Sequence, residues 1–248
     1  MKNMEKSEKV SVVIDGRTFQ AEKDTSVLEV ARENGVYIPS LCYNSEVTSS
    51  GGSCRVCLVE AHQGGRMRLV TSCNFPVREG LEVKTDTPLV HRIRRGVLEL
   101  LLARVPDSEV IREMAAAEGL TEVRFRKDEG ENDRYKCIAC ALCTNVCAEV
   151  VGVHAIAMVG RGADKKPATP YDKPSDVCIG CGACAYACPT GAIVLREEGG
   201  VRHIWHKDFK MVRCSVCGIP YIPEAQVDWI VRRTGKDRSF FDKCPDHR

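Results

Sequence analysis

The run CIACALCTNVC at residues 137–147 is matched in pattern by CIGCGACAYAC at residues 178–188. Both have the spacing C-x2-C-x2-C-x3-C, and Pro189 follows the second. Three thiolates from one tight loop can hold part of a four-iron cube, and the fourth must come from elsewhere in the chain. The duplicated spacing therefore predicts two [4Fe–4S] clusters. The alternative of paired zinc knuckles or disulfides is disfavoured, because it would not require this duplication.

The two runs are expected to exchange ligands. In ferredoxins with two clusters, the fourth cysteine of each run binds the other cluster. One predicted cluster is therefore bound by Cys137, Cys140, Cys143 and Cys188. The other is bound by Cys178, Cys181, Cys184 and Cys147. Small residues at 180, 182 and 183 would let backbone amides approach the cluster sulfurs.

A separate cysteine set lies near the start of the chain, with the spacing C-x11-C-x2-C-x15-C. Its members are Cys42, Cys54, Cys57 and Cys73. Plant-type [2Fe–2S] ferredoxins share the C-x2-C pair but have a shorter first interval, C-x4-C. Here the longer loop contains Gly51-Gly52, which lets it fold tightly against a cluster. We predict a [2Fe–2S] site, with a four-cysteine zinc site as the alternative.

The surroundings of this set predict a β-grasp fold. Residues 10–22 (VSVVIDGRTFQAE) form a predicted hairpin that turns at Asp15-Gly16. Residues 27–35 (VLEVARENG) form a helix that Thr25 or Asp24 can cap. Later strands are expected over residues 66–73 and 81–86. The order of hairpin, helix, cysteine loop and strands is typical of a β-grasp ferredoxin.

Two helices follow this predicted domain. The first begins at Thr87-Pro88, since proline is favoured at the first helical position. Its expected apolar face consists of Leu89, Ile93, Val97, Leu100 and Leu101. The second covers residues 107–119, and the charged residues 126–134 form a predicted solvated linker. Residues 165–176 are expected to form a proline-rich surface loop between the two cluster runs.

A third cysteine set lies near the end of the sequence. Cys214 and Cys217 form a CxxCG knuckle, and Cys244-Pro-Asp-His247 forms a second one. Three thiolates and one imidazole suit a tetrahedral zinc ion. A cubane or a rubredoxin-type iron is the alternative. Between the knuckles a short helix is expected, with Val227, Ile230 and Val231 as its packing residues, while His203 and His206 are expected at the surface.

Composition limits the classes of function. The 248 residues carry 36 basic and 34 acidic side chains, and a net charge of +2 does not favour nucleic-acid binding. The polar first residues predict no secretory signal, and residues 97–105 are too short to span a membrane. We therefore expect a cytoplasmic location, and in that reducing compartment fifteen cysteines indicate metal ligation. No catalytic residue is identified, because no fingerprint for NAD, flavin or molybdopterin is visible.

Three stretches resemble a known family. IPSLCYNSEVTSSGGSCRVCLVE (38–60), YKCIACALCTNVCAEVVGVHAIAMVGRG (135–162) and CIGCGACAYACPTGAI (178–193) are similar to the iron–sulfur subunit of NADH:quinone oxidoreductase. They also resemble the small subunits of NAD-linked hydrogenases and formate dehydrogenases. The resemblance covers residues 10–200. It implies an electron-transfer subunit with a flavin/NAD(P)H-oxidising partner, a catalytic hydrogenase or formate dehydrogenase partner and a place in anaerobic metabolism.

The sequence departs from this family in one segment. Relatives usually carry a His-x3-Cys-x2-Cys-x5-Cys cluster between the first two cysteine sets, but residues 74–136 contain no cysteine. That cluster cannot form here. His91, without neighbouring cysteines, is expected to be an ordinary polar residue of its helix.

We therefore expect an α+β chain in four parts. These are a [2Fe–2S] β-grasp domain (1–86), a helical connector (87–134), a two-[4Fe–4S] ferredoxin domain (135–205) and a zinc-ribbon-like tail (206–248). The expected function is a relay of single electrons within a multisubunit oxidoreductase. The alternatives are an iron–sulfur subunit of the succinate dehydrogenase or fumarate reductase type, and a free redox carrier or sensor.

Overall fold

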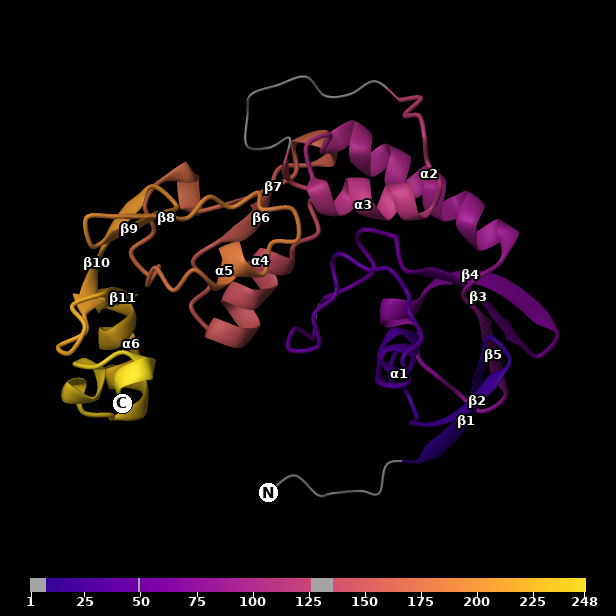
Figure 1. Cartoon of the computed structure of the whole chain (residues 1–248), viewed down its shortest axis with the longest axis horizontal. Coiled ribbons are helices and arrows are strands. Elements are labelled where there is room, and N and C mark those ends of the chain that lie inside the picture. The colour runs from indigo at the N-terminus through magenta and orange to yellow at the C-terminus, as the bar shows by residue number, and fades with distance from the viewer. Residues whose placement is uncertain (1–7, 49, 126–135) are drawn as a thin grey trace. The chain divides into compact units, whose positions relative to one another are not determined.

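The computed structural model describes residues 8–48, 50–125 and 136–248. The chain divides into two compact units, Met1–Cys140 and Ala141–Arg248 (Figure 1). The predicted linker at residues 126–134 lies outside the described residues. None of the helices in the described ranges is both long and apolar enough to cross a bilayer.

The first unit is built on a five-stranded sheet in the order β2-β1-β5-β3-β4. Its strands are β1 (Lys9–Ile14), β2 (Arg17–Glu22), β3 (Leu58–Gln63), β4 (Arg66–Thr71) and β5 (Leu81–Lys84). The predicted hairpin is confirmed: β1 and β2 pair antiparallel around Asp15 and Gly16, both of which have positive φ. β1 also pairs parallel with β5, and this makes the sheet mixed.

Helix α1 (Val27–Glu33) packs on one face of this sheet. The sequence suggested Thr25 or Asp24 as the N-cap of this helix, but neither residue caps it. Ser26 does so, because its hydroxyl accepts from the Glu29 amide while the Glu29 carboxylate accepts from Ser26. Apolar residues of α1, including Leu28 and Val30, pack with strand residues such as Ile14 in one buried cluster. A mixed sheet covered by one helix is the predicted β-grasp arrangement.

Helices α2 (Pro88–Arg104) and α3 (Glu109–Ala117) lie side by side, as Figure 1 shows in magenta. The predicted start at Thr87-Pro88 is confirmed, since the Thr87 hydroxyl accepts from the Val90 amide. The predicted apolar face of α2 is wrong by one position. The buried stripe is Val90, Arg94, Leu98 and Leu102, and Leu100 is 55% exposed.

Two charged residues explain this error. Arg94 and Glu99 are both buried on α2, so the apolar pattern alone misplaces the buried face. Arg94 donates to the Leu58 carbonyl at 2.8 Å, and Glu99 accepts from the Arg124 guanidinium at 2.8 Å. Each buried charge is thus satisfied by a neighbouring segment.

The hydrogen-bond partners of His91 in the described residues are carboxylates and not cysteines. Its Nδ1 lies 2.6 Å from a Glu118 carboxylate oxygen, and its Nε2 bonds Asp86. Its ring therefore joins the start of α2 to the end of α3, which is consistent with an ordinary structural role.

The second unit has short helices and two small sheets. The first cysteine run contains α4 (Leu142–Asn145), which is continued by a π-helical stretch (Val146–Val151), and the second run contains α5 (Ala183–Tyr186). The strands are β6 (Ala157–Val159), β7 (Lys166–Ala168), β8 (Arg196–Glu198), β9 (Val201–Ile204), β10 (Lys207–Arg213) and β11 (Pro220–Pro223), and α6 is Glu224–Thr234. Short 3₁₀ turns cover Gly162–Asp164, Pro170–Asp172, Arg238–Phe241 and Pro245–His247 in this unit, and Ser72–Asn74 in the first unit.

The larger sheet of this unit has the order β11-β10-β9-β8. The proposed domain boundary between residues 205 and 206 lies in the tight turn of the β9–β10 hairpin. The sheet is therefore continuous from the ferredoxin segment into the tail. In α6, Val227 is fully buried, as expected, and Ile230 and Val231 are partly buried.

Candidate metal centres

The four cysteines of the first set converge inside the first unit. The four cysteines are all buried, and they come from the loop after α1 (Cys42), the segment before β3 (Cys54 and Cys57) and the turn after β4 (Cys73). The Cys54 amide donates to the Cys42 sulfur at 3.4 Å, and the Gly52 amide donates to the Cys73 sulfur at 3.0 Å. Backbone donors thus already face the sulfur atoms.

The glycine pair before Cys54 has the role that the sequence suggested. Gly51 has φ +99°, and a Cβ there would lie 3.0 Å from the Cys73 sulfur. Because this approach is so close, a side chain at this position would displace the thiol. The tight loop around Cys73 therefore requires glycine.

Thiol-to-thiol hydrogen bonds place these four sulfurs in one group. The Cys54 thiol, and then that of Cys73, donate to Cys42 and lower its pKa to about 2. The Cys73 thiol similarly lowers the pKa of Cys57 to about 6. The pKa values of the donors Cys54 and Cys73 are raised, because their protons are held by these bonds. Four buried thiols grouped in this way form one candidate set of metal ligands.

The cysteine-free connector packs directly on this group. Leu98 and Leu102 of α2 and Ile111 of α3 share one buried cluster with Cys42 and Cys54. Ile138 and Cys140 pack against the same cluster, and the Arg104 guanidinium donates to the Cys137 carbonyl at 2.7 Å. The apolar helix pair therefore contacts both the first cysteine set and the start of the first ferredoxin run.

In the second unit, four cysteines line one small cavity. They are Cys147, Cys178, Cys181 and Cys184, the set predicted to share one cluster. The remaining lining is largely apolar and includes Ile156, Ile204 and Trp205. Burial raises the pKa of Cys184 to about 11, and it also raises those of Cys178 and Cys181. The structure thus brings a residue of the first run to three residues of the second.

The glycines of the second run are required by packing as well as by the turn. Gly180 and Gly182 have φ of +68° and +79°. A Cβ on Gly180 would lie 2.6 Å from the Phe209 ring, and one on Gly182 would lie 2.8 Å from Leu195. Neither position has room for a larger residue.

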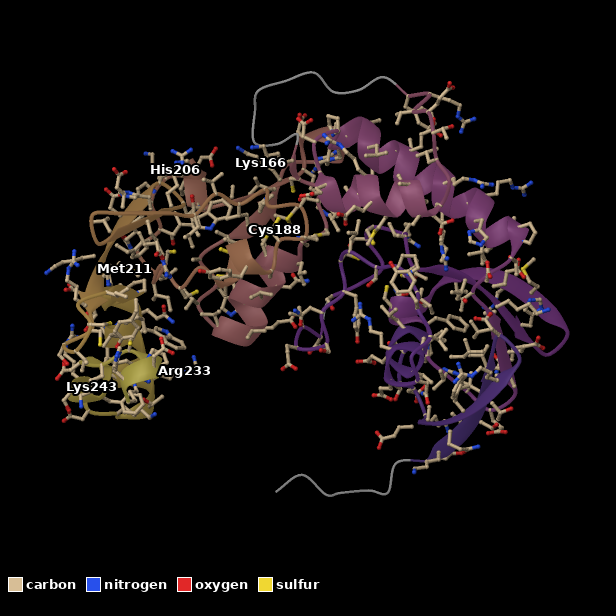
Figure 2. All side chains as sticks on the ribbon, viewed as in Figure 1. Lys166, Cys188, His206, Met211, Arg233 and Lys243 are labelled. Carbon is tan, nitrogen blue, oxygen red and sulfur yellow. The ribbon has the colours of Figure 1, made fainter. Side chains whose placement is uncertain are left out.

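The other predicted cubane set falls on both units. Cys137 and Cys140 end the first unit, whereas Cys143 and Cys188 belong to the second. The Cys137 sulfur accepts from the Ala139 amide at 3.3 Å, and that of Cys188, labelled in Figure 2, accepts from the Ala192 amide at 3.2 Å. The assignment of these four cysteines to one cluster stays a prediction.

The tail brings together its four predicted ligands. The ligand atoms of Cys214, Cys217, Cys244 and His247 all lie within 4.8 Å of one another. His247 Nδ1 lies 3.1 Å from the Cys244 sulfur and 3.8 Å from that of Cys214. The backbone amides of Cys217 and then Cys244 lower the pKa of Cys214 to about 6. This geometry suits a small tetrahedral metal site.

Three residues beside the cavity of the second unit were not predicted as part of this site from the sequence. The Trp205 indole donates to the Cys184 sulfur at 3.2 Å, and Arg202 donates to the Gly180 carbonyl at 2.8 Å. Lys207 donates to the carbonyls of Ser175 and Cys178. Cysteine spacing carries no information about these partners. The exposed ring of His206 and the bond from His203 to Asp208 agree with the expected surface positions.

Comparison with known proteins identifies two kinds of iron–sulfur domain in this chain. The family model of the 2Fe-2S iron-sulfur cluster binding domain matches residues 7–88. The model of the 4Fe-4S dicluster domain matches residues 136–192 and 177–219. The chain is an iron–sulfur protein. It contains a [2Fe–2S] domain followed by a region with two [4Fe–4S] clusters.

Named relatives share most of this iron–sulfur chain. It is 34% identical over 205 residues to the NADPH-Fe(3+) oxidoreductase subunit alpha of Geobacter sulfurreducens, covering 75% of the chain and 24% of that protein. It is 33% identical to the NADP-reducing hydrogenase subunit HndD of Solidesulfovibrio fructosivorans, covering 79% of the chain and 37% of that protein. It is 30% identical to the NADH-ubiquinone oxidoreductase 75 kDa subunit of Reclinomonas americana, covering 79% and 31%.

These relatives are much longer proteins, since the chain spans only 24% to 37% of their lengths. A solved structure of an NAD+-reducing [NiFe]-hydrogenase in the H2-reduced state contains a similar chain. The match has a TM-score of 0.56 at 29% identity and covers 64% of this chain and 74% of that one. The predicted resemblance to NADH:quinone oxidoreductase and NAD-linked hydrogenase subunits is therefore confirmed.

Proposed function

We propose that this iron–sulfur protein relays single electrons within a multisubunit oxidoreductase. Its partners would be a flavin/NAD(P)H-oxidising subunit and a catalytic metal subunit of the hydrogenase or formate dehydrogenase type. The observation that carries the proposal is the convergence of two separate cysteine sets, one in each unit. The names of relatives that act on NADP, NADH or NADPH support the partner classes.

The proposed ligands of the [2Fe–2S] cluster are Cys42, Cys54, Cys57 and Cys73. Those of one [4Fe–4S] cluster are Cys178, Cys181, Cys184 and Cys147, and those of the other are Cys137, Cys140, Cys143 and Cys188. The shared cavity around Cys147 supports the crossed arrangement, because a cysteine of the first run lines it with three of the second.

Bound clusters would supply one-electron redox chemistry. The chain's own residues exclude water and hold the sulfurs in place. Amides of Gly52, Cys54 and Ala155 donate to cysteine sulfurs, and such donors favour the more negative, reduced state of a metal–thiolate group. The apolar walls of both sites limit solvent access, which also affects reduction potential.

For the tail we propose a zinc ion bound by Cys214, Cys217, Cys244 and His247. The mixed thiolate and imidazole set supports zinc over a cubane, which more often takes four thiolates. A structural role follows, because zinc does not change its oxidation state. We also propose a cytoplasmic location, since a reducing compartment keeps clustered cysteines available as metal ligands.

Metal analysis tests the cluster assignment. Protein purified anaerobically should contain about ten irons per chain, as expected for one [2Fe–2S] and two [4Fe–4S] clusters. Cys147→Ala should remove about four of them and eliminate one cubane signal in electron paramagnetic resonance (EPR) spectra. Cys217→Ala is the matched control and should leave the iron content unchanged. A Cys147 variant with full iron would contradict the crossed assignment.

Reconstitution tests the relay. The isolated chain should not oxidise NAD(P)H, and mixing it with a flavoprotein partner should restore electron flow to an acceptor. If the chain alone, free of flavoprotein, reduces dyes with NADH at a rate typical of enzymes, the relay proposal is wrong.

A further inference from the structure

The turn of the β9–β10 hairpin has an unusual composition. Ile204 pairs with Lys207, so Trp205 and His206 form a two-residue turn, and their φ angles are +53° and +60°. Such turns need positive φ at both positions and therefore favour Asn-Gly or Asp-Gly. A tryptophan held in the left-handed region is conformationally unfavourable, and such strain often accompanies function. The turn thus carries a cost that the hairpin alone does not require.

The position of the indole explains what this turn achieves. Trp205 lines the cavity formed by Cys147, Cys178, Cys181 and Cys184, and its Nε1 lies 3.2 Å from the Cys184 sulfur. An indole N–H can only donate a hydrogen bond, so the sulfur is the acceptor. His206, labelled in Figure 2, is the exposed partner in the same turn. The hairpin therefore directs one turn residue to the cysteines and the other to solvent.

We propose that Trp205 is a positioning residue that raises the reduction potential of the [4Fe–4S] cluster bound by Cys147, Cys178, Cys181 and Cys184. This inference rests on the proposed ligand set of that cluster. When the cluster accepts one electron, the charge of the cluster and its thiolates becomes more negative by one. A donor directed at a ligand sulfur stabilises that added charge, and no proton has to move.

Two cationic side chains, Arg202 and Lys207, would also stabilise the added negative charge of the reduced cluster, but they act less selectively. Arg202 is buried and donates to the Gly180 carbonyl, yet its charge is partly balanced by Glu197 at 2.6 Å. Lys207 is committed to backbone carbonyls of residues 175 and 178. Replacing either cation would also loosen the cysteine loop. Trp205 is therefore the residue whose donor can be removed with the least disturbance.

Trp205→Phe removes the donor and keeps an aromatic ring in the cavity. The test is a potentiometric titration of the holoprotein followed by EPR, with the relevant signal identified as the one that Cys147→Ala eliminates. We expect the midpoint potential of this cluster to shift to a lower value, while the other two clusters keep theirs. Trp229→Phe is the matched control, because it alters the chain's other tryptophan, which stacks with Arg233 on α6. It should cause no shift.

The outcomes separate this inference from the proposed function. If the wild-type protein lacks a signal that depends on Cys147, the cluster assignment fails. If the signal is present but Trp205→Phe leaves its midpoint unchanged at full iron content, Trp205 serves only packing and the inference is wrong.

Should Trp205→Phe lose the cluster, a shape-conserving replacement decides the question. In a Trp229→Phe background, the remaining tryptophan can be replaced by its benzothiophene analogue, which has no N–H. A lowered potential supports the inference, and an unchanged potential overturns it.

Discussion

The two units bury their cysteines in different ways. In the first unit, Cys57 and Cys73 belong to a buried cluster of sixteen residues in which the other fourteen are aliphatic. In the second, the corresponding buried cluster has seven residues, and three of them are Cys143, Cys147 and Cys184. The first set of thiols is therefore enclosed by a core that other residues form. The second set is a large part of its own core.

This difference separates two ways of making a metal site. A sheet with a packed helix can hold four thiols close together before any metal binds. A loop-rich segment with few buried apolar side chains recovers too little free energy to offset backbone ordering, which costs about 1–2 kcal/mol per residue. Such a segment depends on metal binding for folding. The comparison predicts where cluster loss matters.

Removal of all iron should therefore affect the second unit most. In protein treated with a chelator under reducing conditions, we expect amides of residues 142–204 to lose nearly all protection from hydrogen exchange. The sheet from β1 to β5 should keep most of its protection. Hydrogen exchange with mass spectrometry measures both in one sample, with the holoprotein as reference. Equal protection of the second unit with and without iron would overturn the comparison.

Leu98→Ala tests whether the first unit depends on its apolar core. Leu98 is fully buried between the helix pair and the loop that carries Cys42 and Cys54. Truncating such a side chain typically lowers the free energy of unfolding by about 2–5 kcal/mol. Anaerobic urea denaturation followed by circular dichroism measures this loss.

Leu100→Ala is the control for that variant, because its side chain is on the same helix but 55% exposed. It should change stability by less than about 0.5 kcal/mol. If both variants lose the same stability, the buried face of α2 has been assigned to the wrong residues.

The same helix illustrates how far the sequence predicts the fold. Thr87-Pro88 specifies the start of α2 locally, and the local signal was sufficient. Its buried face depends on partners distant in sequence, since Leu58 and Arg124 satisfy Arg94 and Glu99. No periodicity rule recognises a buried arginine. Strand β3 was not predicted either, because its residues follow the cysteine pair and carry Glu60 and His62.

At the candidate metal sites, too, some residues are predictable from the sequence and others are not. Cysteine spacing predicts four sets of candidate ligands, and the structure brings the members of three of them together: the first-unit set, the set that lines the cavity and the tail set. It could not predict Trp205, which reaches Cys184 from a hairpin 21 residues away. The choice of Ser26 over Thr25 as the cap of α1 also depends on backbone conformation. Candidate ligands are thus indicated by local spacing, whereas the groups that contact a ligand sulfur come from tertiary structure.

His247→Ala sharpens the comparison within the second unit. If the tail also depends on metal for its structure, the variant should lose its single zinc and the hydrogen-exchange protection of residues 214–247. The iron spectra should stay unchanged, because the ligand atoms of this site are distinct from the cluster cysteines. His206→Ala, with an exposed ring, is the control. Anomalous diffraction at the zinc edge identifies the metal, and an iron signal there would contradict the zinc assignment.

The smallest expected effect concerns His91 in the first unit. Hydrogen bonds to Glu118 and then to Asp86 raise the pKa of His91 above its ordinary value of 6.5. Because the folded state binds the proton more tightly, this pair of bonds stabilises the fold fully below about pH 6.5. The contribution is lost as pH rises through the raised pKa. The side chain is 38% exposed, so the effect should stay below about 1 kcal/mol.

The variant His91→Gln tests this dependence, since it retains hydrogen bonding but cannot be charged. The stability difference between wild type and variant should be largest in mild acid and should shrink as pH increases. Arg94 lies 3.5 Å from Glu118 and supplies a fixed positive charge, so Glu118 keeps a partner in the variant. Urea denaturation of both proteins at several pH values measures the difference. A gap that is constant or grows with pH would show that the carboxylates do not hold the His91 proton.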